Sequence, residues 1–235
     1  TIYNTFFEVN GMCGRFTLTA SIAEIAERFS AEYSFKDEDY SSSYNIAPSQ
    51  SVLAVINDGQ TNRMGFLRWG LIPPWAKDVS IGHKLVNARA ETLTEKPSYR
   101  HAFQKKRCLI VADSFYEWKR VNNQKIPMRI LLKSHELFSM AGLWEQWKSP
   151  NGDSIFSCTI ITTKPNPLMA SIHDRMPVIL KPQDEPLWLD PTISDPQKLK
   201  NLLKPYDEQW MEAYEVSQLV NSPKNNSPDL IQPID

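Results

Sequence analysis

The sequence predicts an α+β fold in which a compact, mainly antiparallel β-barrel-like core carries peripheral helices. Short apolar segments of strand character outnumber the helical segments, and turn residues separate them. Neither an internal repeat nor a long linker divides the chain. With 235 residues the chain is long enough to bury one substantial core. We therefore expect a single domain over residues 12–235.

The predicted helices are few and each begins at a capping signal. Ser21 and Glu24 match a capping box, and apolar residues follow at helical spacing, which predicts a helix over about 21–33. Aspartate followed by proline at Asp195-Pro196 is typical of a helix start and predicts a short helix near 196–203.

The predicted strands share runs of apolar and β-branched residues bounded by turn residues: 51–56, 63–72, 107–118, 126–133, 137–147 and 154–163. The sequence Asn-Asp-Gly-Gln at 57–60 predicts the turn between the first two. Asn151-Gly152-Asp153 predicts a hairpin between the last two. The segment 36–43, KDEDYSSS, is acidic and polar and predicts a loop.

Composition is typical of a globular protein, with 41% hydrophobic and 23% charged residues. No segment approaches the roughly 18 apolar residues of a membrane span. The first ten residues lack the basic region and the apolar core of a secretory signal. We expect a cytoplasmic monomer without a membrane partner, associated with the nucleoid if the host is bacterial.

The three cysteines are widely spaced and form no CxxC pair, and the four histidines are scattered. Zinc-site spacing is therefore absent, and we expect neither a metal ion nor a cofactor. Cys108 and Cys158 lie in apolar runs and are expected to be small core residues. Cys13 differs because Gly14 and Arg15 follow it.

The charge is unevenly distributed. The net charge of −1 argues against nucleic-acid binding. Residues 63–107, however, contain ten Lys/Arg and three Asp/Glu, a local balance of +7 that leaves −8 for the rest. Such a segment is compatible with a phosphate-backbone partner, and equally with a solvated face of the protein.

Six polar residues lie in apolar or turn-like surroundings: Asn87 and Arg89 in KLVNARAET, Glu117 in SFYEWK, and His173, Asp174 and Arg175 in SIHDRMPVIL. Glu117 could be a strand residue on a solvent face, and His173 a core histidine with satisfied hydrogen bonds. No G-x-S-x-G elbow, phosphate-binding glycine loop or H-E-x-x-H motif is present.

Seven segments in order resemble one family: GMCGRF, YNIAPSQ, RWGLIPPW, NARAET, FYEWK, HDRMPVIL and LIQPI. The chain resembles the SRAP family, the SOS response-associated peptidases, from Met12 to about Ile234. That family includes proteins that cross-link to abasic sites in single-stranded DNA. The resemblance implies the SRAP fold and a role in the DNA-damage response.

The implied chemistry requires a cysteine at the mature N-terminus. An opened abasic sugar exposes an aldehyde, which a neutral α-amine can attack to form a Schiff base. The thiol on the neighbouring carbon can then close a five-membered thiazolidine ring. A lysine could perform only the first step. The resemblance therefore implies that Cys13 is the nucleophile.

The resemblance also implies roles for residues in the other segments. Glu117 would be the proton shuttle, and His173 would assist sugar-ring opening from the other side. Asn87 would hold the cysteine amine or a sugar oxygen. Arg15 and Arg89 would contact phosphates.

Three further residues would lie along the DNA strand: Asn45, Pro48 and Trp75. Trp75 would stack on a base or wedge against it. The sequence departs from some family members here, since Ala76 stands where they carry a second tryptophan.

Residues 1–11 precede this motif and leave Cys13 without a free amine. We expect an expression remnant, a misassigned start, or a segment removed by self-cleavage between Met12 and Cys13, the step that gives the family its peptidase name. Two rival functions remain open. One is a thiol peptidase using Cys13, His173 and Glu117, and the other is a non-enzymatic reader of modified DNA bases.

Overall fold

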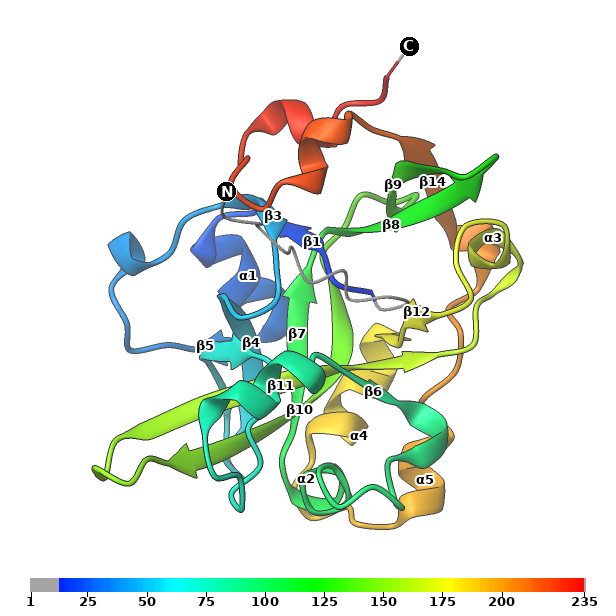
Figure 1. The fold of residues 1–235 in the computed structure, drawn as a ribbon. Coiled ribbons are helices and arrows are strands. Elements are labelled where there is room, and N and C mark those ends of the chain that lie inside the picture. Colours follow the sequence, from blue (N-terminus) through cyan, green and yellow to red (C-terminus); the bar gives the residue numbers. More distant parts are fainter. Residues whose placement is uncertain (1–12, 235) are drawn as a thin grey trace.

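The computed structural model describes residues 13–234, so the expected extra segment 1–11 lies outside the described residues. The predicted α+β class is confirmed: strands occupy the middle of the molecule and short helices lie around them (Figure 1). The helices are α1 (Ile22–Phe29), α2 (Arg100–Lys105), α3 (Pro167–Ala170), α4 (Glu185–Leu189) and α5 (Pro196–Lys200). Among the helices of 13–234, none is long and apolar enough to cross a membrane.

A closed ring of five strands forms the barrel: β4 (Ser51–Asn57), β5 (Asn62–Trp69), β7 (Arg107–Ala112), β10 (Phe138–Lys148) and β11 (Ser154–Thr163). Four of its contacts are antiparallel, running from β5 through β4, β7 and β10 to β11. The ring closes where β11 pairs with β5 in parallel, with Cys158 opposite Trp69. All five strands contribute side chains to the main hydrophobic core.

A second sheet lies beside the barrel, in the order β14 (Met211–Glu215), β9 (Gln124–Leu132), β8 (Ser114–Val121), β1 (Phe16–Leu18) and β3 (Ser43–Ile46). Its strands pair antiparallel throughout. Phe16 lies opposite Phe115, and the Tyr116 amide donates to the Arg15 carbonyl. The pairing of β1 with β8 therefore brings the start of β1 beside the middle of β8.

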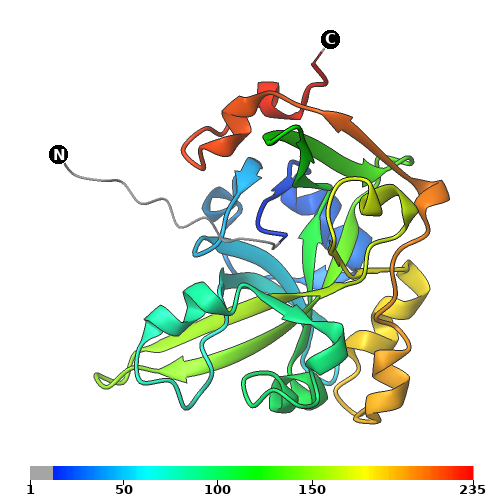
Figure 2. The ribbon, with the colours of Figure 1, turned by 45° about the vertical axis from the view of Figure 1, so that its right-hand side comes forward.

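The C-terminal segment after β14 lies beside this second sheet in both views (orange to red, Figures 1 and 2). A small second core joins the two, with Tyr116 of β8 packed among Val216, Val220 and Leu230. Hydrogen bonds support this packing, since the Tyr116 hydroxyl donates to the Tyr44 carbonyl at 2.9 Å.

The predicted strand 107–118 is wrong in one respect, because it is two strands in different sheets. The break falls at Asp113, whose backbone amide donates to the Thr17 carbonyl. Its carboxylate accepts hydrogen bonds from the backbone amide and the hydroxyl of Thr19. These bonds tie Asp113 to the end of β1, so the chain leaves the barrel after β7 and enters the second sheet as β8.

The predicted helix 21–33 begins as expected, with the Ser21–Glu24 capping box present, but it ends at Phe29. Ser30 adopts a left-handed conformation with φ 46°, and its amide donates to carbonyls of the last turn. The next residues form the short strand β2 (Ala31–Glu32), which pairs in parallel with β5. Asp195 caps α5 as predicted, although that helix ends at Lys200.

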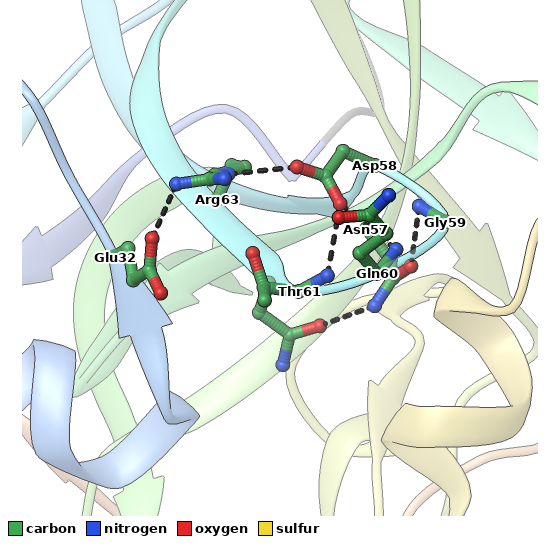
Figure 3. A network of polar contacts seen from close by, with 8 residues as sticks. Glu32, Asn57, Asp58, Gly59, Gln60, Thr61 and Arg63 are labelled. Atoms are coloured by element: carbon green, nitrogen blue, oxygen red, sulfur yellow. Dashed lines mark hydrogen bonds and ion pairs between the residues drawn. The ribbon is translucent and has the colours of Figure 1, made fainter.

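The predicted turn between β4 and β5 is confirmed and is organised by one carboxylate (Figure 3). Asp58 accepts hydrogen bonds from the amides of Gln60 and Thr61 at 2.9 and 2.8 Å. Arg63 donates to the same carboxylate at 2.7 Å, which lowers the pKa of Asp58 to about 2. Arg63 also contacts Glu32 of β2, so two carboxylates neutralise its charge.

The remaining short strands pair with β10 or β11: β6 (Asn87–Arg89), β12 (Met176–Pro177) and β13 (Ile179–Leu180). β6 runs parallel to β11, with Asn87 opposite Ile160. β12 pairs with the end of β11, and β13 pairs with β10. The loop from α3 to β12 is thereby fixed against the barrel, and this loop contains His173.

Candidate active site

Three residues from distant parts of the chain meet in one site. The thiol of Cys13, the carboxylate of Glu117 and the imidazole of His173 all lie within 4.8 Å of one another. Cys13 precedes β1, Glu117 lies on β8, and His173 lies in the loop before β12. The β1–β8 pairing and the docking of that loop against β11 therefore assemble the three residues that the sequence singled out.

Cys13 is buried, with only 5% of its surface exposed. Its thiol donates a long hydrogen bond to the Arg175 carbonyl, with Sγ and O 3.8 Å apart. Burial and the neighbouring Glu117 carboxylate raise the pKa of the thiol well above its usual range. The thiol is therefore held neutral in this site.

Glu117 is 2% exposed, so it does not lie on a solvent face of its strand. Burial raises the pKa of its carboxyl group to about 7, although the nearby His173 and the Cys13 thiol oppose the shift. Its Oε1 is buried and has no hydrogen-bond partner in the part of the chain that the structure describes. A carboxyl group with such a pKa can donate or accept a proton near neutral pH.

His173 is oriented by the backbone of its own loop. The Arg175 amide donates to Nδ1 at 3.1 Å, and the Arg175 carbonyl lies at the same distance from this nitrogen, so the loop backbone holds the Nδ1 side of the ring. Nε2 lies 3.9 Å from Oε2 of Glu117. The ring is mostly buried, with 16% of the side chain exposed, and its Nε2 faces the carboxyl group.

An ion pair that the sequence analysis missed supports this loop. The Arg175 guanidinium donates to both carboxylate oxygens of Glu91 at 2.8 and 2.9 Å, and to the Thr162 carbonyl at 2.8 Å. The pair lowers the pKa of Glu91. It joins the segment after β6 to the loop that carries His173. A signal for this pair was present in the sequence, since Glu91 lies in NARAET and Arg175 lies in HDRMPVIL, two of the segments that carry the family resemblance.

Asn87 lies on β6, the strand that leads to Glu91. Its Nδ2 donates to the Ile160 carbonyl at 3.4 Å. Its Oδ1 is buried and without a hydrogen-bond partner among residues 13–234. Two buried oxygens of the predicted site residues, on Asn87 and Glu117, thus remain available as hydrogen-bond acceptors.

The side chains of Arg15 and Asn45 make hydrogen bonds to other residues of the protein. Arg15 donates to Oδ1 of Asn45 at 2.8 Å and to the Val220 carbonyl at 2.6 Å. Asn45 is 1% exposed, and its amide donates to the carbonyls of Ser222 and Asn225 at 3.0 and 2.8 Å. The described hydrogen bonds of Asn45 therefore hold the C-terminal segment against β3. A residue so deeply buried has no surface on which a DNA strand could lie directly.

The other residues expected along the DNA strand are more accessible. Trp75 is 57% exposed in the turn after β5, and Arg89 is exposed at the end of β6. Pro48 is half-buried between β3 and β4. Ala76 anchors the tryptophan turn through its backbone, because its carbonyl accepts a hydrogen bond from Nε1 of Trp147 at 2.8 Å.

The basic segment 63–107 presents less positive charge than its composition predicted. Arg63 is paired with two carboxylates, and Lys106 is paired with the buried Glu145 at 2.5 Å. Arg107 is buried and donates to backbone carbonyls, including that of Phe103 at 2.9 Å. Three of the ten basic side chains are thus engaged in ion pairs or hydrogen bonds within the protein. The other seven are Arg68, Lys77, Lys84, Arg89, Lys96, Arg100 and Lys105.

Comparison with known proteins gives consistent matches. Residues 12–223 match the family described as SOS response associated peptidase (SRAP). The chain is 60% identical over 222 residues to the abasic site processing protein YoqW of Bacillus subtilis, covering 94% of this chain and 99% of that protein. It is 32% identical over 229 residues to the abasic site processing protein HMCES of Xenopus tropicalis, covering 84% and 68% of the two chains.

A solved structure agrees with these sequence matches. The crystal structure of a protein from Bacteroides thetaiotaomicron superposes with a TM-score of 0.87 at 30% identity, covering 94% of this chain and all of that one. The family match spans most of the chain, and the predicted resemblance is confirmed. This chain belongs to the SOS response associated peptidase (SRAP) family.

Proposed function

We propose that this protein acts in the DNA-damage response by covalently capturing abasic sites in single-stranded DNA through the amine and thiol of Cys13. The observation that carries the proposal is the meeting of Cys13, Glu117 and His173 in one buried site. Relatives that bear the name abasic site processing protein support the choice of substrate.

The proposed reaction consumes the aldehyde of a ring-opened abasic sugar. The cysteine amine forms a bond from nitrogen to the aldehyde carbon, and the carbonyl oxygen leaves as water, which gives an imine. The thiol then adds its sulfur to the same carbon and its proton passes to the nitrogen. The product is a thiazolidine, and the net change is the loss of one water without oxidation or reduction.

Glu117 and His173 would move the protons. With a pKa of about 7, Glu117 can protonate the departing hydroxyl group and then accept the thiol proton. Nε2 of His173, next to the same carboxyl group, would assist opening of the sugar ring. We assign Asn87 to holding the amine or a sugar oxygen, since its buried Oδ1 is an available acceptor.

This chemistry requires that the Cys13 amine be free, because an amide nitrogen does not attack an aldehyde. Hydrolysis of the Met12–Cys13 peptide bond, in which water supplies a hydroxyl group to the Met12 carbonyl carbon and a proton to the Cys13 nitrogen, is the peptidase-like step that we propose for the same site. The residues before Cys13 lie outside the described part of the chain, so the proposal for this step rests on the position of Glu117 and His173 beside Cys13.

The rival function of a general thiol peptidase is less well supported. Such enzymes attack with a thiolate whose pKa a neighbouring cation lowers. Here burial and the Glu117 carboxylate raise the pKa of Cys13. Aldehyde capture tolerates a neutral thiol, because the amine attacks first. A reader of modified bases would not require the three side chains to meet.

We assign the DNA contacts to accessible groups first. Trp75 would stack on a base and Pro48 would lie along the strand. Arg89 would contact a phosphate. Arg15 would contact another, with its guanidinium oriented by the hydrogen bond to Asn45. Asn45 would then act indirectly, by fixing Arg15 and the C-terminal segment.

Substitution of Cys13 by serine distinguishes the three functions. Protein beginning at Cys13, and its Cys13→Ser variant, would be incubated with abasic single-stranded DNA and, separately, with unfolded protein substrates. We expect the Cys13→Ser variant to form no heat-stable adduct with the DNA but still to bind it. Adduct formation by the variant at the parent rate would refute the proposal, and proteolysis that depends on Cys13 without any adduct would favour the peptidase.

A further inference from the structure

The active site has the donor set of a zinc site, which the spacing of these residues in the sequence did not indicate. Cys13, Glu117 and His173 supply a thiol, a carboxylate and an imidazole, and Zn²⁺ binds all three types. Tetrahedral zinc with bonds of about 2.0–2.3 Å needs donor atoms about 3.4–3.7 Å apart. The donors lie within 4.8 Å of one another, and Oε2 of Glu117 lies 3.9 Å from Nε2 of His173. A contraction of about 1 Å would therefore complete the geometry.

An independent observation on Glu117 points to a bound cation. Its Oε1 is buried and lacks a hydrogen-bond partner within residues 13–234. A buried oxygen without a partner lowers stability. A cation bound by the carboxylate would satisfy this oxygen, by direct coordination or by compensating its charge.

The contacts of the His173 ring are also compatible with Zn²⁺ bound through Nε2. Its Nδ1 lies 3.1 Å from the carbonyl of Arg175, so a ring that binds metal through Nε2 can donate its Nδ1–H to that carbonyl. Metal-binding histidines are commonly oriented by such a bond from the other ring nitrogen. The ion pair between Arg175 and Glu91 fixes the loop that supplies this carbonyl.

Once its amine is free, Cys13 offers a fourth donor. The nitrogen and sulfur of a 1,2-aminothiol can hold one metal ion in a five-membered chelate ring. We propose that the form with a free Cys13 amine binds Zn²⁺ through this nitrogen and sulfur together with Glu117 and His173. The thiol proton, and that of the ammonium form of the amine, pass to solvent on binding, with no change of oxidation state.

Zinc in this position would prevent cross-linking, because it occupies both atoms that react with the aldehyde. The ion is thus a reversible blocking ligand of the site and takes no part in the reaction. This consequence rests on the proposed function, whereas metal binding itself does not.

Cobalt provides a direct test because Co²⁺ reports its ligands by absorption. Reduced protein beginning at Cys13 would be freed of metal with EDTA, dialysed and titrated with Co²⁺. We expect one equivalent to produce a thiolate-to-cobalt charge-transfer band and the visible bands of a tetrahedral ion, both displaced by Zn²⁺. Cys13→Ser should abolish the charge-transfer band.

The other ligands are tested with a matched histidine control. His173→Ala and Glu117→Gln should each weaken Co²⁺ binding by at least about ten-fold, since outer partners alone account for roughly 10–100-fold at such sites. His135→Ala should leave binding unchanged, because His135 is exposed and pairs with Glu212 on β14. Absence of the band, or its persistence in Cys13→Ser, would overturn the zinc site.

Separate cross-linking measurements distinguish this inference from the proposed function. In EDTA the parent protein should form the DNA adduct, and added Zn²⁺ should slow the reaction in proportion to occupancy until EDTA is restored. Cross-linking that proceeds at the same rate with the site fully occupied would overturn the blocking role. Failure to cross-link even in EDTA would instead contradict the proposed function and leave the spectroscopic result intact.

Discussion

His173 and Glu117 face each other across the candidate active site, with Nε2 of the imidazole 3.9 Å from Oε2 of the carboxyl group. The Arg175 amide holds the opposite ring nitrogen. Nε2 of the imidazole therefore lies beside a carboxyl group whose pKa is about 7. This pair can donate and accept protons within one small volume, which both steps of aldehyde capture require.

Loss of either member of this pair should slow capture. Glu117→Gln and His173→Ala are expected to reduce the single-turnover rate of adduct formation by about 10²-fold or more, the usual contribution of a positioned acid–base group. His135→Ala is the control and should react at the parent rate, since its contact is with Glu212. Parent rates in both active-site variants would remove Glu117 and His173 from the mechanism.

Glu117→Gln should also change how stability depends on pH. The folded-state pKa of Glu117 is about 7, above the usual 4.5, so the folded chain retains a proton that the unfolded chain releases. The resulting stability is fully present below about pH 4.5 and is lost as the pH rises through about 7. Its full size is about 3 kcal/mol.

Urea unfolding in EDTA at pH 5 and pH 8 checks this expectation. The parent protein should lose up to about 3 kcal/mol more of its free energy of unfolding between these pH values than Glu117→Gln does. Because the free energy of unfolding of each protein is compared with its own value at the other pH, a constant effect of the substitution on stability cancels. An identical pH dependence in the two proteins would contradict the raised pKa.

Arg89→Ala should weaken DNA binding through the loss of one phosphate contact. In the Cys13→Ser background, which keeps binding reversible, we expect the affinity to fall for all sequences alike and the salt slope to decrease by about one. Arg63→Ala is the matched control, because Asp58 and Glu32 already neutralise this arginine. Fluorescence anisotropy across a salt series measures the affinity and the salt slope of each variant. Equal effects of the two substitutions would mean that general charge, and not a contact at Arg89, determines binding.

Trp75→Ala should remove a stacking surface. The expected loss is about 1–3 kcal/mol of binding free energy, nearly independent of salt. Trp210→Ala is the control, since Trp210 is similarly exposed at 60% but lies just before β14. If losing Trp75 changed the salt slope and left the low-salt affinity alone, stacking would be the wrong role for this residue.

Local signals in the sequence predicted much of the fold. The capping box at Ser21, the Asp-Pro start of α5 and the turn at 57–60 all rest on short-range hydrogen bonds that neighbouring residues make. The break at Asp113 was not predicted, because its partners Thr17 and Thr19 lie almost a hundred residues earlier in the chain. The early end of α1 at Ser30 depends on a left-handed conformation that serine rarely adopts.

The candidate site followed from a resemblance to a family, since no single motif assembles it. Burial could not be inferred from the sequence: Asn45 is a polar residue in the segment YNIAPSQ, yet it is 1% exposed and its amide donates to carbonyls of the C-terminal segment. The Arg175–Glu91 pair was also missed, because the two residues are 84 positions apart and meet only through the packing of β6 and β12 around β11.

The requirement for a free amine and thiol on Cys13 is the central claim, and intact-mass analysis tests it most directly. Protein beginning at Cys13 would be mixed with an abasic single-stranded oligonucleotide, and so would the chain beginning at Thr1. We predict for the first an adduct with the summed mass minus one water, unchanged by borohydride because a thiazolidine has no imine to reduce. We predict no adduct for the second while its N-terminus remains intact. Equal adduct yields from both chains, or a product that borohydride reduces, would contradict the account.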